Sequence, residues 1–295
     1  MLLPLFFTGG PDWASSPLVK AIWNLGHIAF FWLLVTWLYP SQTRPTWRAW
    51  GLVTVAVLIV GALVEAAQDG LQREADWHDM LRNLAGAWLA LAWQMRAEPC
   101  QPGVGRLRMW LPRALPLALV LFELALVVQV ATQQVLIQQQ LPVLYDFSSQ
   151  QPQRYWSGNV SRDRDLAQTG SHALRINLGT EQYSGASLDN LAADWRGYER
   201  LELSLLNPST TPLAMTLRIN DRRHDRGDNA FDDRFNQRLH LEPGYNRFTI
   251  DLDQVRHAPA GREMEMNDIR RLGLFAVRLP APRVVYLLDM SLDLP

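Results

Sequence analysis

The side chains best suited to chemistry in the first half of the chain surround residues 65 to 86. Helical spacing aligns Glu65 with Gln68, and Asp79 with Asn83. An apolar helix upstream adds an imidazole, and a guanidinium lies between the two aligned pairs. The candidate catalytic set is His27, Glu65, Gln68, Arg73, Asp79 and Asn83. Such a set suits binding of an anionic head group or general acid and base catalysis on it, and it equally suits a structural ion-pair network.

Structural roles are the alternative for several polar residues of this half. Asp79 stands where a helix begins and suits an N-cap, and Asn83 suits helix packing. Arg82 is expected to reach lipid head groups with its long side chain. Glu123 interrupts an apolar run and is expected to pair helices. The set has no Ser or Cys nucleophile, which argues against an acyl-enzyme mechanism.

A second polar cluster occupies residues 220 to 236, NDRRHDRGDNAFDDRFN. Its usual explanation is a solvated loop between strands, with Arg262 paired to its carboxylates. However, Asp, Asn, Arg and His are directional partners for sugar hydroxyls, and aromatic rings can stack on a sugar face. The sequence therefore predicts a glycan site at this cluster and at aromatic residues near it. The candidate ligand-binding residues are Tyr183, Trp195, Asp221, His224, Arg234 and Phe235.

Long apolar runs precede the first cluster and flank it. Residues 21 to 43 and 49 to 64 are uncharged, residues 114 to 144 contain only Glu123, and residues 79 to 95 form a weaker fourth run. A helix of about 20 apolar residues crosses a bilayer. The sequence therefore predicts an α-helical transmembrane bundle of four spans over residues 1 to 140.

The basic residues of the loops predict an orientation for these spans. The loops after the first and third spans hold Arg44, Arg48, Arg96, Arg106, Arg108 and Arg113, against Lys20, Arg73 and Arg82 on the other side. Basic residues near span ends stay in the cytoplasm. We therefore expect a multi-pass protein of a bacterial-type inner (cytoplasmic) membrane, with residues 141 to 295 extracytoplasmic.

Residues 141 to 295 change to strand periodicity. Apolar residues alternate at Leu174/Ile176/Leu178, Leu201/Leu203/Leu205, Met215/Leu217/Ile219 and Phe248/Ile250/Leu252, with turns such as Glu242-Pro243-Gly244 between them. Evenly spaced short strands with such turns are typical of an all-β sandwich. The sequence predicts about ten strands arranged as a jelly roll.

Composition excludes two classes of site. The 28 Lys and Arg residues balance 29 Asp and Glu residues, so no basic excess is present for a nucleic-acid partner. Cys100 is the single cysteine, which rules out an internal disulfide and a cysteine-built metal site.

The helical cluster resembles the VanZ-like family: a His in the first helix, then E-x-x-Q, Arg, D-x-x-x-N and Gly86 across the next two. The resemblance covers about residues 18 to 135. It implies a small integral membrane protein of the cell envelope, in a family with some members linked to resistance to glycopeptide antibiotics. It does not imply a settled reaction.

The second half resembles the galactose-binding-like jelly rolls of carbohydrate-binding modules over about residues 143 to 295. The resemblance rests on Tyr145-Asp146-Phe147, Gly170 to Ile176, Trp195-Arg196-Gly197-Tyr198 and Leu288-Asp289. In such modules carboxylates near the first and last strands help to hold a structural calcium. The resemblance therefore implies a calcium at Asp146 and Asp289, and it implies no other cofactor.

These observations favour an envelope protein that presents a glycan-binding jelly roll outside the cytoplasm, with an outward polar pocket for an anionic or glycan-bearing lipid. One alternative is an integral membrane enzyme that acts on a phospholipid or glycolipid, with Glu65, Asp79 and His27 as acid and base groups. A second alternative is an interaction scaffold of the envelope.

Overall fold

The computed structural model describes residues 11–12, 14–39, 45–69, 77–94, 104–145, 147–163 and 172–294, without the side chains of 64–69 and 104–111. The chain divides into two compact units, Met1–Thr132 and Gln133–Pro295. The division lies a little before residue 140, where the sequence predicts the boundary. The last turns of the final long helix belong to the second unit, in which Gln134 donates a hydrogen bond to Asn190.

Four long helices build the first unit: α2 (Pro17–Leu38), α3 (Trp47–Asp69), α4 (Trp77–Gln94) and α5 (Val104–Gln139). Helix α4 packs against α2 and against α3. Gly86 permits the close approach of α4 to α2, because a Cβ atom there would collide with the backbone carbonyl of Ile28. Apolar side chains fill the contact around α4: Phe31, Val35, Val57, Leu84, Ala87, Ala90 and Leu91.

The prediction of a four-span bundle is wrong. Within the described residues, two helices are long and apolar enough to cross a membrane, Pro17–Leu38 and Pro112–Gln139. The apolar part of α3, Trp47–Leu63, is shorter, and α4 carries Asp79 and Arg82 in its first two turns. The helices also do not form a clear bundle, because α2 and α3 pack on α4 while α5 reaches α4 through polar contacts such as that of Arg113 with the Ala92 carbonyl.

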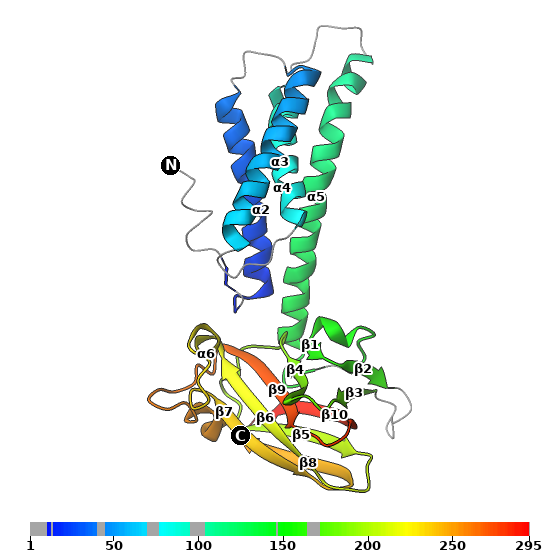
Figure 1. Cartoon of the computed structure of the whole chain (residues 1–295), viewed down its shortest axis with the longest axis vertical. Helices are drawn as coiled ribbons and strands as arrows, with labels where there is room; N and C mark the ends of the chain where they lie inside the picture. The colour runs from blue at the N-terminus through cyan, green and yellow to red at the C-terminus, as the bar shows by residue number, and fades with distance from the viewer. Residues whose placement is uncertain are drawn as a thin grey trace. The chain divides into compact units, whose positions relative to one another are not determined.

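The expected β-sandwich is present in the second unit (Figure 1), as two antiparallel five-stranded sheets with strand orders β1-β4-β9-β6-β7 and β2-β3-β10-β5-β8. The strands of the first sheet are β1 (Trp156–Gly158), β4 (Tyr183–Leu188), β9 (Ile269–Val277), β6 (Leu213–Asp221) and β7 (Phe235–Leu241). Those of the second are β2 (Val160–Asp163), β3 (Ala173–Leu178), β10 (Arg283–Asp293), β5 (Arg200–Asn207) and β8 (Gly244–Asp251). Short helices η1 (Pro152–Arg154), α6 (Arg222–Arg226) and α7 (Leu252–Arg256) fill the connections.

The core of the sandwich lies between the two sheets. On β6, Met215, Leu217 and Ile219 are buried, and the residues between them are partly exposed. The same alternation on β3 follows from the two-residue period of a strand, which sends alternate side chains to opposite faces. The outer face of the β1-β4-β9-β6-β7 sheet is therefore left for other side chains, and the candidate site lies there.

Candidate functional site

One row of residues crosses the outer face of the β1-β4-β9-β6-β7 sheet. Register places Ser157 opposite Ser187, Ser187 opposite Gly273, Gly273 opposite Arg218, and Arg218 opposite Asn236. Directly opposite residues on a sheet have their Cβ atoms within about 5.5 Å. Small residues on three neighbouring strands therefore leave a shallow floor, and the Arg218 side chain rises at its edge.

The second wall of the hollow is aromatic. The Tyr183 ring is 65% exposed and meets the Phe275 ring edge to face, with centroids 5.8 Å apart. Gly185 lies opposite Phe275 on the neighbouring strand. A Cβ atom on Gly185 would collide with the Leu274 carbonyl oxygen and with the Phe275 Cα and Cβ atoms, so glycine permits the close approach of β4 to β9 there. Glycine inside a strand often marks such a close approach.

The residues between α6 and β7 bring a second guanidinium to the hollow. Asn229 has a φ of 53°, and its side-chain oxygen accepts hydrogen bonds from Arg218 at 3.2 Å and from Arg234 at 3.3 Å. Arg234 also donates to Asn236 and lies over the Phe231 ring, 5.5 Å from its centroid. Two arginines are thus held side by side by amide groups and an aromatic face.

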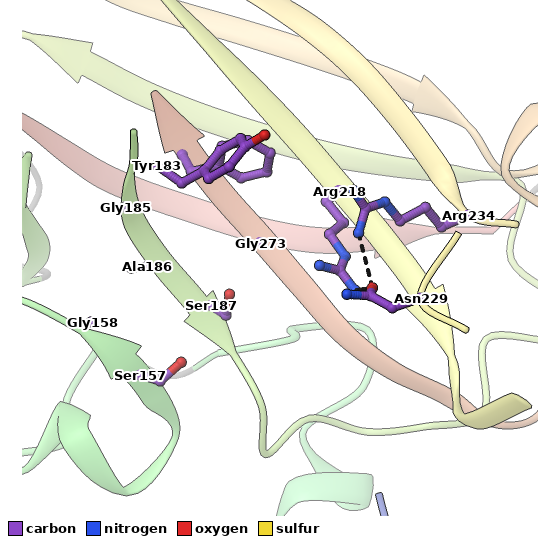
Figure 2. A pocket seen from close by; sticks show the side chains of 11 residues that line it. Ser157, Gly158, Tyr183, Gly185, Ala186, Ser187, Arg218, Asn229, Arg234 and Gly273 are labelled. Carbon is purple, nitrogen blue, oxygen red and sulfur yellow. Dashed lines mark hydrogen bonds between the residues drawn. The ribbon is translucent and has the colours of Figure 1, made fainter. Parts of the chain in front are cut away.

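These side chains line a pocket of about 490 Å³. Figure 2 shows Tyr183 on one side, Arg218, Arg234 and Asn229 on the other, and Gly273 between them, with Gly185 on the strand that carries Tyr183. The pocket is lined by Ser157, Gly158, Tyr183, Gly185, Ala186, Ser187, Arg218, Asn229, Arg234, Gly273 and Phe275. Its volume falls within the range of about 300 to 1,000 Å³ that is typical of ligand sites.

His224 fixes Arg218 from beneath. The His224 side chain is buried, and its Nδ1 lies 3.0 Å from the Asp233 carbonyl oxygen and 3.2 Å from the Asp233 Oδ2. Both of these oxygens only accept, so Nδ1 is the donor. On the other side of the ring, Nε2 lies 3.1 Å from the Arg218 Nη2 and 2.9 Å from the Asn229 side-chain oxygen. Arg218 also donates to Asn220 at 3.0 Å. These bonds orient its guanidinium group toward the pocket.

A separate ion-pair cluster, the Arg262 clamp, supports these residues. Arg262 donates to Asp221 and Asp233, which raises the pKa of the guanidinium. Burial alone raises the pKa of Asp221, but hydrogen bonds from Arg262 and from the backbone N–H groups of Glu265 and His224 hold it below its usual value of 3.8. The hydrogen bond from Arg262 likewise lowers the pKa of Asp233. The clamp confirms the predicted partner of Arg262.

The structure separates the six predicted ligand-binding residues into two groups. Tyr183 and Arg234 line the pocket. The side chains of the other four are buried: Trp195, Asp221, His224 and Phe235. The expectation that these four contact a ligand directly is therefore wrong. Trp195 belongs to the core, where its Nε1 donates to the Ala192 carbonyl oxygen at 2.8 Å. Its ring is therefore unavailable for stacking on a sugar.

Asp221 and His224 act through their neighbours. Asp221 caps α6, where its carboxylate accepts the His224 backbone N–H at 2.9 Å, and it belongs to the Arg262 clamp. His224 positions Arg218. The segment predicted to be a loop thus contains a capped helical turn. Its Asp221 and Asp233 pair with Arg262, and its Arg222 pairs with Asp268, both outside the segment.

Several pocket residues were missed in the sequence. Arg218 lies within the alternating run Met215/Leu217/Ile219, at a position that the two-residue period of a strand points to the outer face. Gly185 and Gly273 interrupt two strands, and a glycine inside a strand was the available signal for a close approach. The register that places Gly273 opposite Ser187, and Arg218 opposite Gly273, depends on the pairing of strands and cannot be predicted from any one strand.

The expected calcium site finds no support among the described residues. Asp289 is exposed on β10, next to a register shift between Leu287 and Asp289, and Asp146 lies outside the described residues. The described part of the chain contains no group of three or more His, Cys, Asp or Glu side chains that is arranged to hold a metal ion. A calcium ion prefers six to eight oxygen ligands, so Asp146 and Asp289 alone would not complete its coordination.

The first unit contains a buried polar network of its own. The His27 Nδ1 lies 3.0 Å from the Asn83 side-chain oxygen, and the His27 Nε2 lies 3.6 Å from Asp79. Arg82 donates to Asp79 at 2.6 Å and to Glu123 at 2.9 Å. Arg82 is buried, so the expectation that it reaches lipid head groups is wrong, whereas Glu123 joins two helices as expected.

This network brings together only part of the predicted catalytic set. His27, Asp79 and Asn83 converge, and Arg82 lies between two carboxylates that balance its charge. Arg73 and the side chains of Glu65 and Gln68 lie outside the described residues. Since a buried charge is stable when it is paired and hydrogen-bonded, the contacts among the five described groups account for their burial.

No family model matches this chain, and no curated protein matches it. The resemblance of residues 18 to 135 to VanZ-like proteins therefore has no support from a family model. Among solved structures, an exo-beta-agarase matches with a TM-score of 0.42 and 12% identity, over 52% of this chain and 25% of that chain. The chain thus spans about a quarter of the agarase.

Two carbohydrate-binding modules also match. The family 11 module from Clostridium thermocellum, in complex with a beta-1,3-1,4-mixed-linked tetrasaccharide, has a TM-score of 0.34 and 10% identity over 47% of this chain and 86% of its own. The solution structure of CtCBM11 has a TM-score of 0.39 and 14% identity over 52% and 94%. At these TM-scores the likeness carries no weight for function, so the pocket is judged by its own side chains.

Proposed function

We propose that this protein binds a glycan in the pocket between Tyr183 and the pair Arg218 and Arg234. The observation that carries the proposal is the combination of an exposed aromatic ring with oriented donors over a floor of small residues. Sugar recognition needs both parts, because the ring face is apolar while the hydroxyl groups require directional hydrogen bonds. Asn229 and Ser187 add neutral polar groups to the same pocket.

The glycan proposal is tested with a pair of tyrosine variants. The full-length protein in detergent is applied to a glycan array, and dissociation constants are then measured for the glycans retained. Tyr183→Ala should weaken binding at least about tenfold, equivalent to about 1.4 kcal/mol. Tyr245→Ala is the matched control, since Tyr245 is 56% exposed on β8 of the other sheet. Equal losses in both variants, or no retained glycan, would contradict the proposal.

A second variant blocks the floor without removing a polar group. Gly273 lies at the centre of the residue row, and its backbone has an ordinary strand conformation. In Gly273→Leu an isobutyl group would occupy the space between Ser187 and Arg218. We expect binding to be lost while the protease resistance of the sandwich is retained. Unchanged binding would place the glycan elsewhere on the sandwich.

We further propose that the helices of the first unit hold the sandwich at a membrane. Within an apolar 18-residue stretch of each helix, only 6% of the residues are buried in Pro112–Gln139 and 22% in Pro17–Leu38. A helix of a soluble domain buries its apolar side, and large exposed apolar surfaces otherwise mark contacts with lipid or protein. Exposed apolar side chains occur along α5, among them Leu115, Leu121, Phe122 and Val128.

Basic residues support an extracytoplasmic sandwich without any appeal to four spans. Arg106, Arg108 and Arg113 stand at the start of the Pro112–Gln139 segment, and the next basic residue after it is Arg154. Basic residues accumulate on the cytoplasmic side of a span, so the sandwich lies on the opposite side.

A cysteine introduced at Thr210, in the exposed turn after β5, should react with an impermeant maleimide in spheroplasts, while Cys100 should react only after permeabilisation. The reverse pattern would contradict this orientation.

A further inference from the structure

The pocket holds two arginines that form no ion pair within the described residues, although Asp225 and Asp189 attract Arg218 from a greater distance. Neither Arg218 nor Arg234 forms an ion pair with any carboxylate of the described residues, and no Asp or Glu lines the pocket. Their hydrogen bonds go to side chains other than carboxylates: Asn220, His224, Asn229 and Asn236. Two partly buried cations without a carboxylate partner are costly to the fold, because buried charges are stable when they are paired.

Other arginines near this sheet have carboxylate partners. Arg271 donates to Asp189 at 2.6 Å, and Arg222 forms a bidentate pair with Asp268. The Arg262 guanidinium is held by two carboxylates. Acidic partners are therefore present near this sheet, and Arg218 and Arg234 pair with none of them in the described residues.

Electrostatics agree with this geometry. Burial lowers the pKa of Arg218 to about 10, and repulsion from Arg234 and Arg271 acts in the same direction. Burial also lowers the pKa of Arg234. Both groups remain protonated at neutral pH, so the pocket holds two cations close together. An anion placed between them would relieve their repulsion.

The two guanidinium groups also keep donors available. Arg218 uses its Nε and Nη2 atoms in the hydrogen bonds to Asn220, His224 and Asn229, and Arg234 uses its Nε and Nη1 atoms. In the described residues, the Arg218 Nη1 and the Arg234 Nη2 have no hydrogen-bond acceptor. Arginine binds planar or tetrahedral oxyanions through paired N–H groups.

We propose that the pocket selects an acidic sugar, a uronate or a sugar sulfate, whose anionic group is bound by Arg218 and Arg234 while the sugar ring lies against Tyr183. This inference rests on the proposed glycan-binding function and names the class of glycan. The aromatic wall distinguishes such a ligand from a bare anion, because a sugar ring can pack against the exposed Tyr183 ring and an inorganic ion cannot. Ser157 and Ser187 lie in the same pocket for the hydroxyl groups of the sugar.

The test compares matched glycans that differ only in charge. Full-length protein in detergent is titrated with cellohexaose and with the β-1,4-linked glucuronate hexamer, and the same comparison is made on an array that prints further backbones in neutral, uronate and sulfated forms. We expect the charged form of the recognised backbone to bind at least about tenfold more tightly. This preference should shrink as the salt concentration rises, since salt screens charge.

Charge-removing variants complete the test. Arg218→Gln and, separately, Arg234→Gln should reduce the charged-to-neutral preference to about onefold to threefold. Arg200→Gln on β5 of the opposite sheet is the matched control, because it removes the same charge from an exposed position and should leave the preference unchanged. Two arginine variants are used so that misfolding of one, detected by protease sensitivity, does not prevent a decision.

Each outcome bears on a different claim. If neutral glycans bind as well as their charged forms and Tyr183→Ala still abolishes binding, the acidic-sugar inference is overturned while the glycan site stands. If sodium sulfate alone displaces the glycan at equal molarity, the pocket recognises a bare anion and the inference is likewise overturned. If no glycan of either kind binds, the proposed function itself fails.

Discussion

Two arginine sites in the sandwich differ in the groups that surround the charge. At the clamp, Arg262 is held between Asp221 and Asp233, and the ion pairs raise its pKa. In the pocket, Arg218 faces Asn229 and a second arginine, and its pKa is lowered to about 10. In the folded protein the Arg262 guanidinium has carboxylate partners, whereas the Arg218 guanidinium has none among the described residues. The comparison indicates that the clamp supports the fold, whereas the pocket is arranged for a molecule that brings negative charge.

Removal of the clamp arginine should produce the largest effect. In Arg262→Met the Asp221 carboxylate, whose side chain is fully buried, would lose its cation. Breaking one partner of a buried ion pair costs about 3–5 kcal/mol. We therefore expect a large fall in the urea midpoint of the sandwich. The midpoint is measured by the protease sensitivity of the full-length protein. Arg200→Met is the exposed control.

A double variant distinguishes the lost charge from lost packing. Adding Asp221→Asn to Arg262→Met removes the unpaired carboxylate, so part of the stability should return. An Arg262→Met protein as stable as the Arg200→Met control would contradict the distinction between clamp and pocket. No return of stability in the double variant would attribute the loss to packing or to the cap of α6.

Acid should weaken the clamp next. Hydrogen bonds with Arg262 hold the pKa values of Asp221 and Asp233 below the ordinary 3.8. A carboxylate whose pKa is lower in the folded state contributes stability above its unfolded pKa and loses it as the pH falls through the folded value. The urea concentration at the unfolding midpoint should therefore decrease once the pH is lowered below about 4. In Arg262→Met this part of the acid dependence should be smaller, and an identical profile would argue against the clamp.

The sequence predicts the part of the molecule that repeats. Buried Leu174, Ile176, Leu217 and Ile219 follow from the alternation of apolar residues, since a strand has a period of two. The sequence also predicts part of the polar cluster of the helices, because Asp79 and Asn83 lie one helical turn apart on α4. The four-span model failed because length was counted without the polar residues of α4 and the short apolar run of α3.

The binding residues depend on information that no local pattern contains. Trp195 was assigned to a surface on its aromatic character, but the tertiary structure places it in the core. Arg218 was passed over although it faces outward, because its neighbours on other strands decide what it meets. Only the register that brings Gly273 beside it and the turn that brings Asn229 above it create the pocket.

The smallest effect on stability should come from the pocket itself. In Arg218→Met the hydrogen bonds to Asn220 and His224 are lost, but so are the burial of a charge and its repulsion from Arg234. Because these contributions oppose each other, we expect the unfolding free energy at pH 7 to change by no more than about 1 kcal/mol. Its folded pKa of about 10 lies below the ordinary value of an arginine, so the penalty of charging Arg218 is present at neutral pH and is relieved only as the pH rises through 10. A loss as large as that of Arg262→Met would mean that the pocket arginine supports the fold, and the two sites would then no longer differ in kind. A small change in stability together with lost glycan binding would place Arg218 among residues kept for a ligand.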